Sequence, residues 1–367
     1  MADFTDTIPG PLATEVLAQL GADVIKVGSP ARASSTRQLP VFDYLNNGKR
    51  TISLDLKSSH GRAAALALVE KSDVVVEGFR PGVMSSFGLG YEHLAPTRPD
   101  LVYCSLSGYG DTGPAARRPG HDINYLAAAG VLYRHRGLDG SQVEAPLPAP
   151  TVDIVGGLLA ALGLLAAITE RQRTGRGRRV DTRLSEAALL LGALDLAGVV
   201  TTGREAATPP GMAPYYRLFR TSDGRAISLG ITPAENHFWR ALCAVTGLTE
   251  WSDVSFEERL ERREELEAAL DEVFSSRSLS SWCDLLSGAE IAWAPVATAA
   301  EALVDEAFTR PRPGEAGAAL PLGVEVRVGQ PLGASGADTA GVLAELSCSE
   351  AVRSACLADV AGQPSAS

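Results

Sequence analysis

The first 110 residues alternate between helical and strand-like patterns, and this alternation limits the fold more than any other feature of the chain. Residues 11–20 have the apolar period of a helix and are followed by Gly21, a residue type that commonly ends helices. Strands that alternate with helices in short units are typical of a parallel sheet with helices on its faces. We therefore predict a Rossmann-like α/β domain. The expected strands are residues 22–27, 51–54, 73–77 and 101–106, with a second helix at 61–70.

The middle of the chain is more apolar. Residues 154–168 form an uncharged run of 15 residues, which is shorter than the ~20 residues that a membrane-spanning helix needs. We therefore predict a buried helix over residues 154–171. A strand near residues 180–182 and a helix over 186–200 follow.

A Pro-Gly break at residues 209–211 separates this region from a smaller α+β pattern. An extended stretch at 215–219, a turn at 222–224 and a strand at 226–229 predict a hairpin. Ser255 and Glu258 fit a capping box that begins a charged helix over 256–274. Residues 309–337 have the Pro, Gly and Ala content of a linker, and helices are expected at 339–346 and 349–357.

The charge balance excludes several classes of protein. The chain has 33 basic and 44 acidic side chains, a formal net charge of −11, which argues against nucleic-acid binding. The acidic excess lies in residues 201–367, and all four lysines lie within the first 71 residues. Met1 is followed by neither a basic region nor an apolar one, so we expect no secretory signal, no membrane association and a cytoplasmic protein.

The cysteines and the glycine motifs give little support to metal or nucleotide chemistry. Five widely spaced cysteines without a CxxC pair predict reduced thiols and no metal site. Gly108, Gly110 and Gly113 match GxGxxG, but Pro114 and a second Pro-Gly pair follow within a few residues, so a dinucleotide-binding helix is not expected there. The chain also lacks GKS/GKT, HExxH and GxSxG motifs.

Three side chains stand out as candidates for acid–base chemistry, although each also has an ordinary structural explanation. His121 begins an apolar helix expected over 126–132, where a helix N-terminus favours a neutral imidazole that can act as a base. Asp153 directly precedes the long apolar run, where burial favours a perturbed carboxylate; its ordinary role would be a helix N-cap. Glu235 precedes the apolar segment 238–245 and would otherwise be a helix-start glutamate.

Residues 120–126, GHDINYL, resemble the α-methylacyl-CoA racemases of the class III acyl-CoA transferase superfamily, also called the CaiB/BaiF family. The resemblance covers nearly the whole chain, and GHDINY is the segment that resembles racemases more than transferases. The other matching segments are GPLATEVLAQLGADVIKV (10–27), NNGKRTISLDLK (46–57), SDVVVEGFRPGVM (72–84), SLSGYGDTGP (105–114), RTGRGRRVD (173–181), APYYRLFRTSDG (213–224) and ADTAGVLAEL (337–346).

The resemblance implies a domain arrangement and an assembly. It implies a Rossmann-like large domain at residues 1–185, a connection at 186–212, a small α+β domain at 213–308, and a linker with a C-terminal segment at 309–367 that returns to the large domain. Two subunits would interlock as a homodimer and share the active site. The opening strand of the family would be shortened to a few residues or missing here.

The resemblance also assigns roles to the three candidates. His121 and Asp153, which are 32 residues apart, would flank the α-carbon of an acyl-CoA thioester, and Glu235 of the neighbouring subunit would support His121. Removal of the α-proton on one face and its return on the other would invert the stereocentre. In the transferases of the family, the aspartate is instead a nucleophile that carries CoA between acids. A catalytically silent CoA-binding member is the third alternative.

The expected CoA contacts come from the same resemblance, and no cofactor beyond the CoA moiety and no metal is expected. Lys57 and Arg80 are the firmer phosphate contacts, and Tyr125 is expected near the pantetheine or thioester. Gly28 and Ser86 depart from the family pattern and weaken the contacts expected at the adenine end. Only three methionines occur, so we expect a small or polar acyl group. The further expected contacts are Lys49, Arg50 and Asp122.

Overall fold

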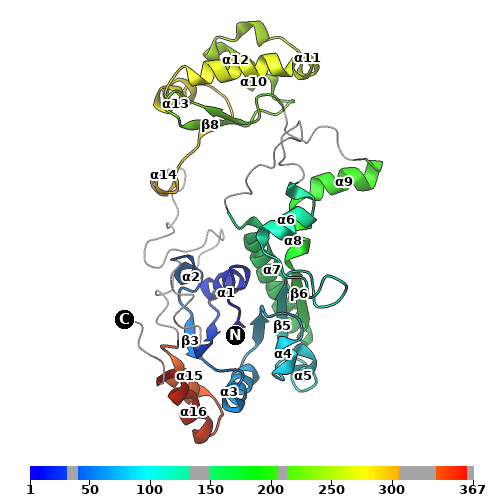
Figure 1. The fold of residues 1–367 in the computed structure, drawn as a ribbon, viewed down its shortest axis with the longest axis vertical. Helices are drawn as coiled ribbons and strands as arrows, with labels where there is room; N and C mark the ends of the chain where they lie inside the picture. The colour runs from blue at the N-terminus through cyan, green and yellow to red at the C-terminus, as the bar shows by residue number, and fades with distance from the viewer. Residues whose placement is uncertain (31–39, 133–148, 205–212, 306–335, 362–367) are drawn as a thin grey trace. The chain divides into compact units, whose positions relative to one another are not determined.

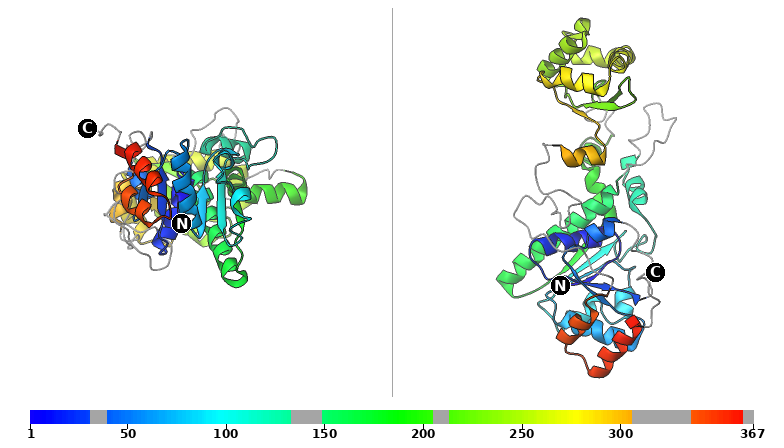
Figure 2. Two further views of the ribbon diagram at one scale, coloured as in Figure 1. Left: turned by 90° about the horizontal axis from the view of Figure 1, so that it is seen from below. Right: turned by 90° about the vertical axis from the view of Figure 1, so that its left-hand side faces the viewer.

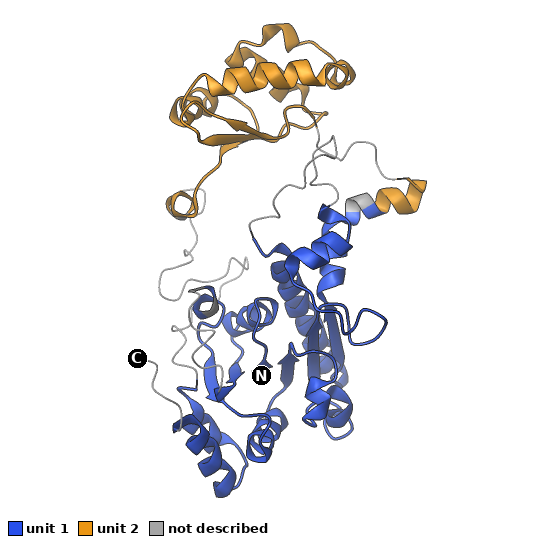
Figure 3. Ribbon diagram, viewed as in Figure 1, with its two compact units in different colours: residues 1–196, 310–367 blue, residues 197–309 orange. Residues whose placement is uncertain are grey.

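The computed structural model describes residues 1–30, 40–132, 149–204, 213–305 and 336–361. The chain divides into two compact units, residues 1–196 with 310–367 (unit 1) and residues 197–309 (unit 2), as Figures 1 and 3 show. Each unit has its own apolar core. The predicted break at 209–211 and most of the predicted linker at 309–337 lie outside the described residues.

Unit 1 is built on a six-stranded parallel sheet with the order β3-β2-β1-β4-β5-β6. The predicted parallel α/β architecture is therefore confirmed. The chain builds outward from β1 in both directions, so the switch point of the topology lies between β1 and β4. The strands are β1 (Ala2–Phe4), β2 (Ile25–Gly28), β3 (Arg50–Ser53), β4 (Val74–Glu77), β5 (Val102–Ser107) and β6 (Arg179–Arg183).

The opening strand β1 is short but central. It has three residues and pairs with both β2 and β4. Ala2 and Phe4 are buried in the apolar core, and Asp3 between them is also buried. The strand that was expected to be shortened or missing is therefore a short one.

Helices cover both faces of this sheet, as the views in Figure 2 show. Val74 and Val76 point to one face and Val75 to the other, as the two-residue period of a strand requires. The first face packs against α1 (Pro9–Gln19), α6 (Asp122–Ala128), α7 (Thr151–Thr174) and α8 (Leu184–Leu191), and the second against α3 (Ser59–Glu70), α15 (Thr339–Glu345) and α16 (Glu350–Ala361). Shorter helices are α2 (Pro40–Tyr44), α4 (Val83–Ser86) and α5 (Tyr91–Leu94).

The C-terminal helices attach to the edge strand β3. The Asp338 carboxylate accepts a hydrogen bond from the Thr51 amide (2.8 Å), and the Thr339 hydroxyl accepts one from the Ser53 amide (3.1 Å). Helix α16 packs on α3. These contacts satisfy backbone groups that an edge strand would otherwise leave unpaired.

Two long helices predicted from the sequence are each broken in the structure. The helix predicted over 186–200 consists of α8 and α9 (Ala193–Thr202), which are separated at Gly192, a residue type that destabilises helix interiors. The helix predicted over 256–274 consists of α11 (Phe256–Glu261) and α12 (Arg263–Ser275), because Arg262 leaves the helical conformation at ψ 31°. The Ser255 hydroxyl caps α11 by accepting from the Glu258 amide.

Unit 2 combines a small antiparallel sheet with helices. The sheet has the order β7 (Leu218–Arg220), β8 (Ala226–Leu229) and β9 (Trp293–Pro295), so the predicted hairpin is confirmed. Trp239 and Trp282 are buried, and each indole donates to a backbone carbonyl, Trp251 O and Phe274 O respectively (both 2.9 Å). The remaining helices are α10 (Asn236–Thr246), the 3-10 turn Thr249–Trp251, α13 (Leu279–Ser287) and α14 (Ala299–Val304).

Helix α7 is the longest helix described and is longer than the sequence predicted. It is long and apolar enough, by composition alone, to cross a membrane, and the bent pair formed by α8 and part of α9 also passes that test. Helix α7 nevertheless packs against α1, α8, β5 and β6 within unit 1, and buried core helices of soluble proteins have the same composition. It ends at Gly175, which has a positive φ of 70°.

Candidate active site

A cavity of about 290 Å³ lies at the carboxyl ends of β1, β4 and β5, within unit 1. Its walls are Thr5 and Thr7 after β1, residues 78–81 after β4, and residues 106–108 at the end of β5. The cavity is completed by Pro9, Gly10, residues 116–121, Tyr125, Asp153 and Leu184. Ligands of open α/β sheets bind outside the carboxyl ends of the strands at the switch point of the topology, and this cavity has that position.

His121 and Asp153 both line this cavity. His121 is the exposed residue directly before α6, and its backbone amide donates to the Asn124 side chain (3.0 Å). Asp153 lies in the first turn of α7 and is partly buried. Two residues that are far apart in the sequence therefore meet in one cavity.

The ends of α6 and α7 are joined by Asp122. Its carboxylate accepts from the backbone amides of Val152 (2.6 Å) and Asp153 (3.1 Å), so it satisfies free amides in the first turn of α7. Asp153 itself is not the N-cap, which corrects its ordinary interpretation: Pro150 occupies that position. Asp122 was expected near the pantetheine or thioester, and here its carboxylate fixes the helix that carries Asp153.

The environment of Asp153 favours its protonated form. Burial raises the pKa of Asp153 to about 6, with Asp122 acting in the same direction and His121 against it. A carboxyl group with a pKa near neutrality can accept and donate a proton at physiological pH.

Tyr125 forms an aromatic wall of the cavity. It is buried, and its hydroxyl donates to the Gly120 carbonyl (2.8 Å). A Cβ at Gly108 would lie 2.5 Å from that hydroxyl, so only glycine fits there. Gly108 was the first glycine of the weak GxGxxG match, and no helix begins between it and α6. The glycine therefore makes room for a tyrosine, and no dinucleotide-binding helix is present among these described residues.

Glu235 belongs to unit 2, whereas the cavity is lined by unit 1 alone. Its carboxylate accepts from the Thr232 amide (2.8 Å) and hydroxyl (2.9 Å), and these bonds hold the pKa of Glu235 below its usual value. It directly precedes α10. Its role toward His121 stays a prediction.

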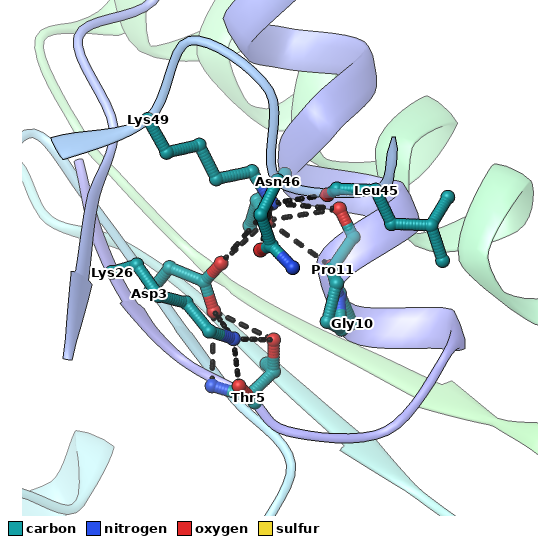
Figure 4. A network of polar contacts seen from close by, with 9 residues as sticks. Asp3, Thr5, Gly10, Pro11, Lys26, Leu45, Asn46 and Lys49 are labelled. Atoms are coloured by element: carbon teal, nitrogen blue, oxygen red, sulfur yellow. Dashed lines mark hydrogen bonds and ion pairs between the residues drawn. The ribbon is translucent and has the colours of Figure 1, made fainter. Parts of the chain in front are cut away.

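Lys49 does not lie where a CoA contact would require it. Its side chain is 0% exposed. Its ammonium nitrogen lies within 2.9 Å of four oxygens, those of Pro11, Thr14, Leu45 and Asn46, and 3.5 Å from the Asp3 carboxylate (Figure 4). The expectation that Lys49 binds CoA is corrected: in this position its donors are occupied inside unit 1.

Lys49 is part of a buried polar cluster, which we define as Asp3, Thr14, Glu15, Lys26 and Lys49. Burial favours a neutral Asp3, but Lys26, Lys49 and two threonine hydroxyls outweigh it and lower the pKa of Asp3 to about 2. Burial lowers the pKa of Lys49 to about 8 and raises the pKa of Glu15 to about 7. The cluster therefore retains an ionised Asp3 in the interior because two lysines face it.

This cluster holds the wall of the cavity. Lys26 donates to the Thr5 carbonyl and Lys49 to the Pro11 carbonyl, the two ends of the segment that follows β1 (Figure 4). The same segment contacts α7 closely, because a Cβ at Gly157 would lie 2.7 Å from the Pro9 carbonyl oxygen. Gly157 is one turn after Asp153 on α7. The buried charges thus fix both a cavity wall and the helix that carries Asp153.

The other predicted cations lie at the surface. Arg50 is engaged by Asp23 and Glu345 (both 2.7 Å), so acidic side chains already occupy it. Lys57 is exposed, and Arg80 is exposed and lines the cavity. Only Arg80 among the predicted basic contacts lies in the same cavity as His121 and Asp153.

Two further arginines of the cavity were missed from the sequence. Arg117 and Arg118 are exposed and lie on the loop directly before Gly120 and His121. Their position in RRPGHD, next to a candidate base, was the available signal. Among the described residues, no group of three or more His, Cys, Asp or Glu side chains could hold a metal ion.

Comparison with known proteins decides the family. Residues 1–312 match the sequence profile of CoA-transferase family III. The chain belongs to that family. A crystal structure of a CaiB/BaiF family protein from Brucella suis shares this fold with a TM-score of 0.79 at 25% identity, over 94% of this chain and 97% of that one.

Relatives in CoA-transferase family III have two kinds of activity. The chain is 33% identical to α-methylacyl-CoA racemase of Homo sapiens over 81% of this chain and 76% of the relative. It is 32% identical to acetyl-CoA:oxalate CoA-transferase of Acetobacter aceti over 82% of this chain and 80% of the relative. The family relationship therefore places the chain in a class of acyl-CoA enzymes. The sequence identities do not distinguish a racemase from a transferase.

Proposed function

We propose that this protein is an acyl-CoA α-epimerase, a racemase-type member of its family, that acts on a 2-substituted acyl-CoA thioester. The observation that carries the proposal is the presence of His121 and Asp153 in one cavity at the switch point of the sheet. The α-methylacyl-CoA racemases among its relatives support it. Two different proton-transferring groups are what inversion at an α-carbon requires.

In the proposed reaction one of the two groups removes the α-proton, and the electron pair left on carbon moves into the thioester carbonyl to give an enolate. The other group donates a proton to the opposite face of the α-carbon, and the carbonyl re-forms. Asp153, with a pKa raised to about 6 by burial, holds a proton readily in one direction of the reaction and accepts one in the other. Backbone amides near the carbonyl would stabilise the enolate oxygen.

The proposal includes an interlocked homodimer in the cytoplasm, in which Glu235 of the partner subunit supports His121. Unit 1 carries His121 and Asp153, and unit 2 carries Glu235, so one active site would use both units. Arg80 and Lys57 would contact the CoA phosphates, since guanidinium binds phosphate bidentately and ammonium binds it as a point charge. Tyr125 would line the thioester end.

Exchange of the α-proton with deuterated water tests the catalytic pair. A single epimer of a 2-methyl-branched acyl-CoA would be incubated in deuterated buffer with wild type, His121→Ala and Asp153→Asn, and deuterium at the α-carbon read by mass spectrometry. We expect wild type to exchange and epimerise, and each variant to lose epimerisation. His93→Ala, on the exposed helix α5, is the matched control and should retain activity. Full activity in both site variants would refute the assignment.

The alternative is CoA transfer, which the oxalate and glutarate CoA-transferases among the relatives favour. The Asp153 carboxylate would attack the thioester carbonyl and expel CoA thiolate, leaving a mixed anhydride. The thiolate would then attack the Asp153 carbonyl, forming an aspartyl-CoA thioester and releasing the free acid. Transfer of CoA onto an added carboxylic acid without α-deuterium incorporation would establish this activity. CoA binding with neither reaction would indicate the third alternative, a silent member.

A further inference from the structure

Three arginines of the cavity have no carboxylate partner among the residues that the structure describes. Arg80 follows β4, and Arg117 and Arg118 precede His121. Among the described residues, Asp153 is the only carboxylic acid that lines the cavity, and the charges that act on it are those of Asp122 and His121. The arginines therefore give the cavity an excess of positive charge and do not form ion pairs with Asp153.

Elsewhere in the described part of unit 1, six arginines are paired with acids. Four other described arginines of unit 1 also have no acid partner in an ion pair. Arg62 and Arg353 donate to backbone carbonyls, and Arg173 and Arg176 lie at the C-terminal end of α7, where free carbonyls attract cations. Arg80, Arg117 and Arg118 differ from these arginines in that they lie together in one cavity. The paired arginines are Arg50, Arg98, Arg171, Arg178, Arg179 and Arg183.

Arg118 is held in place by aromatic rings. Its guanidinium carbon lies 5.6 Å from the centre of the Tyr109 ring, within the range of a cation–π contact. The Tyr109 ring packs edge-on against Tyr125, with ring centres 5.1 Å apart, and Tyr125 lines the cavity. Ordering a guanidinium before the ligand arrives reduces the entropy that binding costs.

The place of these arginines indicates which part of a ligand they meet. They share a cavity of about 290 Å³ with His121 and Asp153. In a CoA thioester, the whole pantetheine arm separates the thioester carbonyl from the nearest phosphate. Arg117 and Arg118 lie within four residues of His121 in the chain, so an anion bound by these two lies near the reacting carbon and belongs to the acyl group, whereas Arg80, which follows β4, is left to the CoA phosphates.

We propose that Arg117 and Arg118 form a binding site for a second carboxylate, so that the preferred substrate is a short dicarboxylic acyl-CoA. This rests on the proposed function only in that the cavity takes the acyl end of a CoA thioester. Guanidinium groups bind carboxylates through paired, charge-assisted hydrogen bonds. The same groups could bind a CoA phosphate, which is the other source of anionic oxygen, and the experiment separates the two.

Binding of unreactive thioethers tests the proposal independently of any turnover. S-(3-carboxypropyl)-CoA would be compared by calorimetry with S-(3-carbamoylpropyl)-CoA, which has the same shape without the charge. Wild type should bind the carboxylate at least about tenfold more tightly, and the R117M/R118M variant should lose that preference while its affinity for the amide stays within about threefold. Arg173→Met, an exposed arginine outside the cavity, is the control and should bind both as wild type does.

Two other results would overturn the proposal. Equal affinity of wild type for the acid and the amide would show that no carboxylate site exists. Equal loss of both ligands in R117M/R118M, with unchanged binding of the S-(3-carboxypropyl) thioether of phosphate-free pantetheine, would assign the arginines to a CoA phosphate. Both arginines are exposed, and an unchanged circular dichroism spectrum would show that the variant folds. An inactive enzyme that retains the carboxylate preference would count against the proposed function alone.

Discussion

Two groups of charged side chains in unit 1 differ in how fully they are paired with countercharges and hydrogen-bond partners. In the buried cluster around Asp3 and Lys49, every charge faces a countercharge or a hydrogen-bond partner, apart from one oxygen of Glu15. At the cavity, Asp153 lies next to a second carboxylate, and the arginines have no acid partner among the described residues. Satisfied charges hold structure, and unsatisfied ones are available to a ligand. The difference separates the supporting part of the site from its reactive part.

The largest effect should follow from substituting Asp153, a proton-transferring group of the cavity. Asp153→Asn removes a proton-transferring group and should lower kcat by about 10²–10⁴-fold. Folding should be retained, since Asp153 is destabilising when ionised: its pKa is raised from 3.8 to about 6. Steady-state kinetics and a urea transition measure both effects. Asp73→Asn, at the amino end of β4 away from the cavity, is the control. A kcat within a factor of two of wild type would contradict the assignment.

Substitutions in the buried cluster around Asp3 and Lys49 should instead lower the free energy of unfolding. Lys49→Met leaves Asp3 buried without one of its two lysines, and loss of one partner of a buried pair costs about 3–5 kcal/mol. The free energy of unfolding from urea denaturation measures this loss. Lys57→Met, at an exposed lysine, should change it by less than about 0.5 kcal/mol. The D3N/K49M double variant should lose less than the sum of the two single variants, and strict additivity would mean that the pair does not interact.

Glu15 offers a smaller effect within the same cluster. Burial raises its pKa from 4.5 to about 7, so the stability that Glu15 contributes is present below pH 4.5 and is lost as the pH rises through 7. Glu15→Gln cannot ionise, and it should gain on the order of 1–3 kcal/mol relative to wild type between pH 5 and pH 8. Urea transitions at several pH values would show the gain; parallel pH profiles for the two proteins would rule out the buried, titrating carboxyl.

Arg50 should have the smallest effect. Its partners Asp23 and Glu345 are both largely exposed, and exposed ion pairs contribute about 0–1 kcal/mol. Arg50→Met should therefore cost at most about 1 kcal/mol in unfolding free energy and leave CoA affinity, measured by calorimetry, unchanged. A loss of CoA affinity of tenfold or more would return Arg50 to the CoA contacts that the sequence suggested.

The sequence predicted the parallel sheet because strand and helix periods are local properties of the chain. Strands at 51–54, 73–77, 101–106 and 180–182 were found within one residue of their predicted positions. The breaks at Gly192 and Arg262 were missed, because packing decides where a long apolar or charged pattern bends.

The site was predictable to a lesser degree. His121 and Asp153 could be singled out by their neighbours in the sequence. Lys49 could not be placed, because its burial depends on Asp3, Pro11 and Thr14, which the fold brings to it. The capping of α7 by Asp122 also depends on a contact between segments that are distant in the sequence.

The central claim is that two different groups in one cavity act on opposite faces of an α-carbon. The most direct test follows the α-hydrogen when wild type acts on one pure epimer of a 2-substituted acyl-CoA in deuterated water. At early times, the account predicts that the inverted product carries deuterium at the α-carbon while the recovered substrate does not. Equal deuterium in recovered substrate and product would indicate one base on one face. CoA exchange without any α-deuterium would contradict the account entirely.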